Sequence, residues 1–371
     1  MDLDDERVAK RRKTMLQDDR GVGQQTTTEM ETLPHEIIVD ILSRLPITSL
    51  VQFKFVCKGW RALAQDPLLA DMQLSWKAPT TNPCLILHCD FPIRNQLYFV
   101  DLSVHNHDKD KVKRLYVPFQ TSMPEFDVVG TCNGLLCLSD SLYNDALYVY
   151  NPFTMDFMEL PKSRQYSDQE VVFGFGFHPK TKQYKVVKIV YYRNTSSSSY
   201  SRARRVVYPQ SDVQVFTLGT SAWRSLGKVA YQLIRRPSEA LVNGRLHWVS
   251  FLAAAVYGNY GKLEIWVMKD YNVKESWIKE FSIGAYMPKC LKQNLVRDRP
   301  LKIWKNPSNG KVVRLLCLLD NGEILLEYKN RVLVSYDPKK GKFTDLVFQG
   351  IPHWFQTVVH AGCFNWINTP S

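Results

Sequence analysis

The chain has 371 residues, of which 45% are hydrophobic and 12% aromatic, and its formal net charge is +12. This length fits one small and one large domain, and the composition excludes collagen, a coiled coil and wholesale disorder. The first residues are charged, and no run approaches the roughly 20 apolar residues that span a bilayer. We therefore expect no signal peptide and a soluble protein of the cytoplasm, the nucleus or both.

Residues 1–30 are polar and lack apolar periodicity, so we expect a disordered N-terminal tail. Within it Lys10-Arg11-Arg12-Lys13 forms a short basic cluster. Such clusters act as nuclear-import signals, although short ones also arise by chance. The tail therefore leaves nuclear entry open.

Residues 31–75 are expected to form a small helical domain. Pro34 suits the first helical position, and Glu36 lies in the first turn, near the positive end of the helix dipole. Helical spacing predicts one apolar face, made of Ile37, Ile38, Ile41, Leu42 and Leu45. Pro46 ends this helix and can open the next. Asp66-Pro67 then predicts a cap and a first-position proline for a further short helix.

Residues 84–367 are expected to form a large β domain, so the fold class is α+β by segment. Short runs rich in Val, Ile, Tyr, Phe and Trp alternate there with Gly, Pro, Asn and Asp turns. Three of the turns share an aromatic residue, a polar residue, a proline and further polar residues, and begin at Tyr150, Phe177 and Tyr336. Strands that end in the same turn favour a β-propeller-like (kelch-like) architecture.

The eight cysteines include two closely spaced pairs, Cys84 with Cys89 and Cys132 with Cys137. A zinc clip that also uses His88 is one interpretation. However, an offset of five residues within a strand puts the two thiols on opposite faces, and no second Cys/His pair stands at ligand spacing. We therefore expect buried reduced thiols, with no metal and no cofactor.

The positive charge belongs to the C-terminal domain. Residues 79–371 hold 37 Lys and Arg against 24 Asp and Glu, a net charge of +13. Such a balance favours an acidic partner or nucleic acid. The only dense basic run is short, so scattered surface charge explains most of it and nucleic acid is the less favoured partner.

Loops are the expected place for substrate recognition in the β domain, because strands supply the scaffold and loops carry binding groups. The loops 192–208 and 287–300 are long and basic. If they converge, they would suit an acidic or phosphorylated segment; otherwise both are solvated insertions. The candidate substrate-binding residues are Arg202, Arg204, Arg205, Lys289, Lys292 and Arg297.

The N-terminal helical segment carries an ordered motif over about 40 residues, formed by Leu33-Pro34, Leu45-Pro46, Ser49-Leu50, Val56-Cys57-Lys58 and Trp60-Arg61. This order and spacing resemble the F-box, and the resemblance implies a three-helix module. A segment of roughly 40 residues cannot bury a dozen large apolar side chains in its own interior. Some of them must therefore form a patch for a partner, or pack on the β domain.

The F-box resemblance implies a Skp-type adaptor as partner, and through it a cullin scaffold with a RING subunit. The residues that the resemblance assigns to this contact are Leu33, Pro34, Ile38, Ile41, Leu42, Leu45, Pro46, Leu50, Val56, Cys57 and Trp60. Their role would be anchoring and not chemistry. No histidine is placed to activate Cys57, which we interpret as a small apolar contact.

Six stretches in the remainder form a second pattern: Gly130–Cys137, Leu147–Pro152, Gly174–Phe177, Tyr184–Val187, Asn243–Trp248 and Leu263–Met268. Together they resemble the F-box-associated domain of plant F-box proteins. Within them Asn133-Gly134 and Asn243-Gly244 predict hairpin turns. The resemblance implies that this domain binds a protein for ubiquitination, and it does not name that protein.

No catalytic constellation is present in the sequence: there is neither a phosphate-binding Gly-rich loop with Lys nor a Gly-x-Ser-x-Gly elbow. The sequence therefore predicts a non-catalytic adaptor of a ubiquitin ligase, without membrane contact. The alternative is a β-propeller sugar-binding or enzymatic domain with an appended helical segment.

Overall fold

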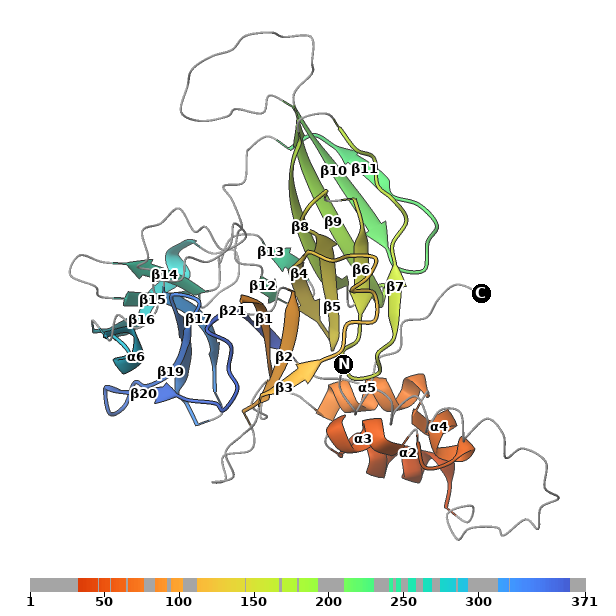
Figure 1. Cartoon of the computed structure of the whole chain (residues 1–371), viewed down its shortest axis with the longest axis horizontal. Helices are drawn as coiled ribbons and strands as arrows, with labels where there is room; N and C mark the ends of the chain where they lie inside the picture. Colours follow the sequence, from red (N-terminus) through yellow and green to blue (C-terminus); the bar gives the residue numbers. More distant parts are fainter. Residues whose placement is uncertain are drawn as a thin grey trace, which may run out of the picture.

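The computed structural model describes residues 33–45, 47–53, 55–64, 66–76, 84–91, 95–102, 112–143, 145–166, 169–178, 180–192, 210–229, 240–242, 245–247, 253–257, 263–268, 274–284, 286–292, 313–319 and 321–360. Helices near the N-terminus are followed by a large region of antiparallel sheets (Figure 1), which confirms the predicted fold class. Among these residues no helix is both long and apolar enough to cross a membrane. The tail and its basic cluster lie outside the described residues.

The helical unit consists of α2 (His35–Ser43), α3 (Ile47–Phe53), α4 (Lys58–Ala64) and α5 (Pro67–Trp76). The last of these is the short helix that Asp66-Pro67 predicts. The Oδ1 atom of Asp66 accepts a hydrogen bond from the backbone N–H of Leu68 at 2.8 Å, so Asp66 caps α5. The fourth helix therefore extends the three-helix unit expected from the sequence, and the first strand begins at Cys84.

The described strands form four four-stranded sheets and two smaller ones. The first sheet joins β21 (Trp354–His360) to β1 (Cys84–Phe91), β2 (Gln96–Asp101) and β3 (Lys113–Leu115). The second consists of β4 (Phe126–Cys132), β5 (Leu135–Asp140), β6 (Leu147–Tyr150) and β7 (Phe157–Glu159). The third consists of β8 (Gln169–His178), β9 (Gln183–Tyr192), β10 (Gln210–Thr217) and β11 (Arg224–Gly227).

The remaining sheets follow in chain order. One pairs β12 (Ala240–Val242) with β13 (Arg245–His247), and the next contains β14 (Ala253–Tyr257), β15 (Leu263–Met268) and β16 (Trp277–Ile283). The last contains β17 (Val313–Leu318), β18 (Ile324–Tyr328), β19 (Val332–Asp337) and β20 (Lys342–Leu346). Two short helices, η3 (Lys274–Ser276) and α6 (Lys289–Lys292), flank β16.

One outer strand of each four-stranded sheet lies next to its neighbour in the following sheet. β21 lies beside both β4 and β17, and β4 lies beside β8, which contacts β13. Because β21 is the last strand of the chain and completes the sheet of β1 to β3, it ties the C-terminal part of the domain to its beginning. This succession of sheets around common inner strands is propeller-like.

The hydrophobic core lies between neighbouring sheets, because alternate residues of a strand face opposite sides. In β5, Leu136 and Leu138 pack toward the sheet of β1 and β2, whereas Leu135 and Cys137 pack toward β8 to β10. β18 likewise divides its residues between the β15–β16 and the β1–β2 sides. Strands that are buried on both faces explain the near-continuous apolar runs of the sequence.

The hairpin at Asn133-Gly134 confirms its sequence prediction. Both residues adopt positive φ, +46° and +81°, as a two-residue hairpin turn of this kind requires. The turn also corrects the expectation for the cysteines, because Cys132 ends β4 and Cys137 lies in β5. They therefore belong to different strands and face the same core instead of opposite faces of one strand.

Candidate docking face on the helical unit

The outer side of α2 exposes aliphatic side chains at helical spacing. Ile37 and Ile41 are 49% and 51% exposed, and Leu33, just before the helix, is also exposed. On the opposite side Val39 and Leu42 are buried. The i, i+4 spacing of the two isoleucines places them one turn apart on the same side. The helix is therefore apolar on both sides, and the outer side has no cover from the described residues.

A second exposed apolar group lies in the turn between α3 and α4. Phe55 and Val56 are 66% and 65% exposed, and Cys57 beside them is exposed as well. The turn is closed by backbone hydrogen bonds from Phe55 to Gln52 and from Val56 to Phe53, both at 3.0 Å. These bonds hold the two large side chains outward, although the exposure of apolar surface to water is unfavourable.

The residues assigned to the adaptor by resemblance divide into three groups by burial. Leu33, Pro34, Ile41, Val56 and Cys57 are exposed. Ile38, Leu45 and Trp60 are half-buried. Leu42 and Leu50 are buried among the helices, so they support the face from below instead of forming it. Pro46 lies outside the described residues.

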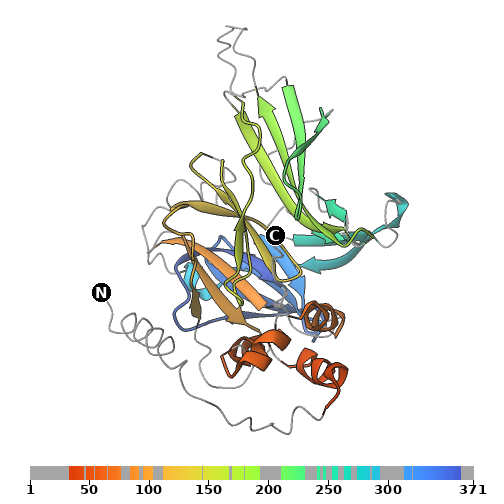
Figure 2. The same ribbon diagram turned by 90° about the vertical axis from the view of Figure 1, so that its right-hand side faces the viewer.

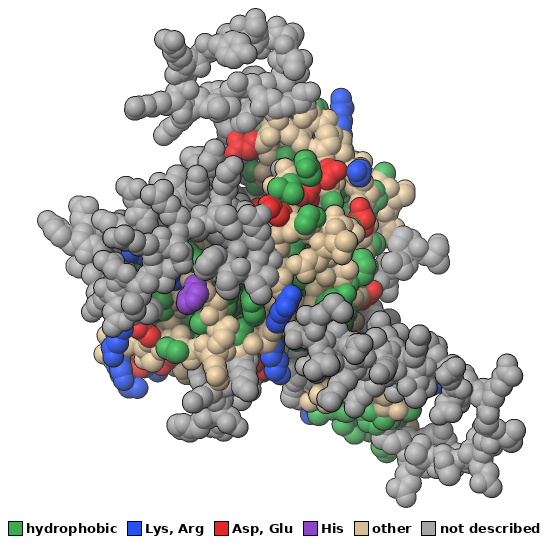
Figure 3. Space-filling model, in the orientation of Figure 1, with side chains coloured by type: hydrophobic (Ala, Val, Ile, Leu, Met, Phe, Trp, Pro, Cys, Tyr) green, Lys and Arg blue, Asp and Glu red, His purple; other side chains and the backbone are tan. Residues whose placement is uncertain are grey.

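Two exposed residues were not included in the sequence assignment, Ile37 and Phe55. Ile37 belongs to the apolar stripe that the helical wheel predicts, and the wheel alone does not say which edge of the stripe is covered. Phe55 has no periodic signal, because it lies in a turn. We define the docking face as Leu33, Ile37, Ile41, Phe55 and Val56. Figure 3 shows hydrophobic side chains gathered on the underside of the helical unit, where Figure 1 places α2.

Polar contacts within the unit fix these helices relative to one another. His35, at the start of α2, contacts the cap of α5 through Nε2 and the Oδ2 atom of Asp66, 2.7 Å apart. The rings of Phe53 and Trp60 meet edge to face with centroids 4.6 Å apart. The Sγ atom of Cys57 accepts a hydrogen bond from the backbone N–H of Trp60 at 3.5 Å. Cys57 therefore helps to begin α4, in addition to the contact role expected from the sequence.

The inner side of the helical unit packs on the β domain. A single hydrophobic cluster joins Leu50 and Leu69 of the helices to Phe99 of β2 and Phe153 of the turn after β6. Phe153 also stacks on His360 at the end of β21, with ring centroids 5.9 Å apart. Figure 2 shows the helices at one end of the sheets. The helices therefore do both things that the sequence left open: they pack on the β domain, and they expose an apolar face.

Two family models match this chain. An F-box-like model matches residues 30–70, and a model described as "F-box associated beta propeller domain" matches residues 86–257. The F-box protein At3g07870 of Arabidopsis thaliana is 53% identical to the chain, with 98% of each protein covered. The chain is an F-box protein. Its relatives also confirm the resemblance to plant F-box proteins with an associated β domain.

Further similarity extends across the family. The F-box protein CPR1 of Arabidopsis thaliana is 26% identical over 87% of the chain and 86% of the relative. An F-box/kelch-repeat protein of the same plant, At3g23880, is 26% identical over 86% and 92%. Proteins with these two domains are typically adaptors and not enzymes. Within the described residues of this F-box protein, no three His, Cys, Asp or Glu side chains cluster as metal ligands would.

The basic residues proposed for substrate binding lie mostly outside the described part of this F-box protein. Arg202, Arg204, Arg205 and Arg297 are not described, and neither is the side chain of Lys292. Lys289 is exposed in α6, where its backbone N–H donates to the Oδ2 atom of Asp345 at 3.0 Å. In the loop 192–208, all residues after Tyr192 lie outside the described residues. A shared basic rim therefore stays a prediction.

Proposed function

We propose that this chain is the substrate-recognition subunit of a Skp–cullin–F-box ubiquitin ligase. The docking face of the helical unit would bind a Skp-type adaptor, which connects to the cullin and its RING subunit. The β domain would hold the protein to be ubiquitinated. The chain itself would supply proximity and no chemistry, because it raises the effective concentration of substrate near the charged ubiquitin carrier.

The observation that carries this proposal is the exposed apolar face on an F-box. Five large side chains from α2 and from the turn before α4 lie at the surface, although a helical unit gains stability by burying such groups. Fully burying each contributes roughly 1.5–3 kcal/mol, so a groove that covers several of them binds strongly. An amphipathic helix in a groove of another protein is a common mode of recognition.

The polar contacts of the helical unit support a preorganised face. The aromatic pair Phe53–Trp60 connects α3 to α4, and the His35–Asp66 contact connects α2 to the cap of α5, before any partner arrives. A preformed surface loses less conformational entropy on binding than a flexible one. We place this assembly in the cytoplasm, the nucleus or both, where adaptor and cullin would be available.

The direct test is binding of the purified full-length chain to a purified Skp-type adaptor, measured by calorimetry. We expect a one-to-one complex for the wild type and loss of binding when Ile41 is replaced by Asp. Deletion of the whole helical unit is a poor control, because it would uncover Phe99 and Phe153 of the β domain. Absence of any complex with the wild-type chain would refute the proposed function.

A further inference from the structure

The turn between β5 and β6 presents the most exposed tyrosine of the described residues. Tyr143 is 75% exposed, and Leu142 beside it is 47% exposed. The buried carboxylate of Asp140 accepts hydrogen bonds from the backbone N–H groups of both residues, at 2.9 Å and 3.2 Å. The backbone N–H of Ser141 also donates to the carbonyl of Glu125 at 3.0 Å. The turn is thus fixed from several sides while its two large side chains point away from the core.

The second sheet has one end near the helical unit, and this turn lies at its opposite end. β6 starts at the turn and ends at the segment that carries Phe153, which packs on the helices. A partner bound at the turn would therefore not compete with one on the docking face.

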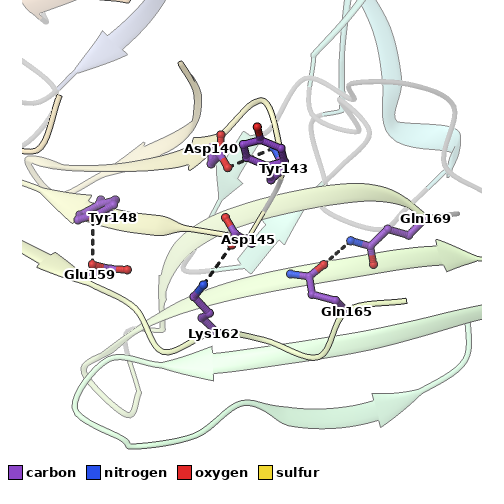
Figure 4. Close-up of polar contacts among 8 residues, drawn as sticks. All are labelled: Asp140, Tyr143, Asp145, Tyr148, Glu159, Lys162, Gln165 and Gln169. Atoms are coloured by element: carbon purple, nitrogen blue, oxygen red, sulfur yellow. Dashed lines mark hydrogen bonds and ion pairs between the residues drawn. The ribbon is translucent and has the colours of Figure 1, made fainter. Parts of the chain in front are cut away.

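Residues 160–166, which follow β7, run along the same edge, and we call them the strap. The Nζ atom of Lys162 in the strap lies 3.2 Å from the Oδ2 atom of Asp145 in the turn (Figure 4).

The strap is anchored on the third sheet by polar side chains. Lys188 of β9, which is fully buried, donates from Nζ to the Oγ atom of Ser163 at 2.7 Å and to the carbonyl of Arg164 at 3.3 Å. The indole N–H of Trp223 donates to the carbonyl of Pro161 at 2.7 Å. Turn and strap therefore form one preorganised surface, with Leu142 and Tyr143 as its apolar anchors. Tyrosine is enriched among the residues that dominate binding energy in interfaces.

The stretch of sequence that carries these anchors has a charge opposite to that of the domain. Residues 116–178 hold eight Asp and Glu against two basic residues, Lys162 and Arg164 of the strap, a net charge of −6. Residues 79–371 carry +13 in total, so the rest of the domain carries +19. Four of the carboxylates lie where strands meet the turn and strap: Asp127 lies near the start of β4, Asp140 ends β5, Glu159 ends β7 and Glu170 lies near the start of β8.

Figure 3 shows acidic side chains around hydrophobic ones on this part of the surface. The crowding of carboxylates also affects two pKa values. Burial raises the pKa of Asp140, and the neighbouring Asp145 adds to this effect, against the two backbone N–H groups that lower it. Burial, with the nearby Glu159, raises the pKa of Tyr148 to about 12. In both groups burial is the larger cause, and the neighbouring carboxylate adds to it.

We propose that the turn residues 141–143 and 145–146, the strap and the surrounding carboxylates hold a Lys- and Arg-rich segment of a partner protein that also carries an apolar side chain. The apolar anchors favour a segment with an apolar side chain, and the negative charge of the surface favours a positively charged segment. This inference rests on the proposed function, because the partner would then be the protein to be ubiquitinated. It concerns a different surface from the arginine-rich loops, for which an acidic segment stays a prediction, and its sign excludes nucleic acid at this surface.

The test uses the full-length chain and a fluorescein-labelled 12-residue peptide of Lys, Arg and Leu, with a counterpart in which Glu replaces the basic residues. Anisotropy should show binding of the basic peptide that weakens as salt is added, and no binding of the acidic one. Tyr143→Ala should weaken binding about tenfold, as should the double change Asp145→Asn with Glu159→Gln. Leu226→Ala on β11 and Glu275→Gln on η3, both exposed in the wild type, should change it less than twofold.

The proposal would be overturned if Tyr143→Ala and the double variant bind the basic peptide as tightly as the wild type does. A preference for the acidic peptide would also overturn it.

The chain's own basic cluster is a competing occupant of this surface. If replacing Lys10, Arg11, Arg12 and Lys13 with Ser strengthens peptide binding more than tenfold, the surface serves that segment and not a partner. Adaptor binding, measured in parallel, should be the same for all variants. If the chain binds the basic peptide but no adaptor, the inference about this surface stands and only the proposed function is refuted.

Discussion

The rings of Phe99 and Phe153 meet edge to face, with centroids 5.2 Å apart and planes at 88°. Phe99 comes from β2 and Phe153 from the turn that leads to β7, so the pair joins two sheets. Both rings also belong to the cluster that contains Leu50 and Leu69 of the helical unit. The helical unit and the β domain therefore share part of their hydrophobic core, and the docking face has a fixed position relative to the sheets.

Replacing Phe153 with Ala should destabilise the whole chain, because it removes an aromatic side chain at the point where helices and sheets meet. A buried Phe→Ala change costs about 3–5 kcal/mol of unfolding free energy. Chemical denaturation would measure this loss. Val347→Ala, a change at an exposed position, should cost less than ~0.5 kcal/mol. A Phe153 variant as stable as the wild type would show that the two parts do not share a core.

Replacing Ile41 with Asp should abolish adaptor binding without unfolding the chain. The side chain is half exposed in the free protein, so the charge stays hydrated until the partner covers it. Desolvation of an unpaired charge in the complex should then weaken binding by at least ~2 kcal/mol, about 30-fold. Leu226→Asp, at an exposed position on β11, is the matched control and should bind normally. Retained affinity in the Ile41 variant would exclude this side of α2 from the contact.

The same substitution at Leu45 has a different expected outcome from that at Ile41. Leu45 is half-buried and packs with the cluster of the helical unit. Asp at this position should therefore lower the stability of the helical unit as well as adaptor binding. A melting curve separates the two effects: the Ile41 variant should melt as the wild type does, and the Leu45 variant should melt earlier.

The sequence predicts the strands and helices better than it predicts the surfaces. Periodicity locates the apolar stripe of α2, and Asn133-Gly134 locates a hairpin, because both signals are local. Whether Leu42 or Ile41 faces solvent depends on what packs against α2, and its neighbour α5 begins only after two further helices in the sequence. The exposed turn at Tyr143 was missed for the same reason. Nothing local distinguishes an exposed tyrosine in a β-rich region from a buried one, and neighbouring strands decide which it is.

An ion pair between a buried carboxylate and a half-buried arginine connects the closing strand to the last sheet. The Oε1 atom of Glu327 in β18 lies 3.0 Å from Nη1 of Arg314 in β17, and its Oε2 accepts from the backbone N–H of Thr357 in β21 at 2.6 Å. Arg314→Met should leave the fully buried Glu327 without its cation, at a cost of about 3–5 kcal/mol in unfolding free energy.

Replacing both partners of this pair, with Arg314→Met and Glu327→Met together, should recover part of that loss, since no uncompensated charge remains. A double-mutant cycle measured by chemical denaturation would check this. If the Arg314 variant is as stable as the wild type, the ion pair does not hold the closing strand.

The buried ammonium of Lys188 should give the chain an unusual pH dependence. Burial lowers the pKa of this group from 10.5 to about 8, although Asp145 and Asp212 partly oppose the shift. Between pH 8 and about 10.5 the unfolded chain therefore binds a proton that the folded chain has released. Unfolding free energy from this group should rise with pH across that interval, by at most ~1.4 kcal/mol per pH unit. Below pH 8 the group is protonated in both states and its contribution is constant.

Chemical denaturation at intervals from pH 7 to pH 9.5 would measure this dependence and stay below the range in which Tyr148, with its pKa raised to about 12, has the opposite effect. Lys188→Met replaces the ammonium with an apolar chain of similar length. Its unfolding free energy should therefore lack the rise above pH 8 that the wild type shows. Lys180→Met, at an exposed position in the turn after β8, should keep the wild-type slope. The same slope in the Lys188 variant would mean that the ammonium is hydrated, and that Ser163 and the strap are held by other contacts.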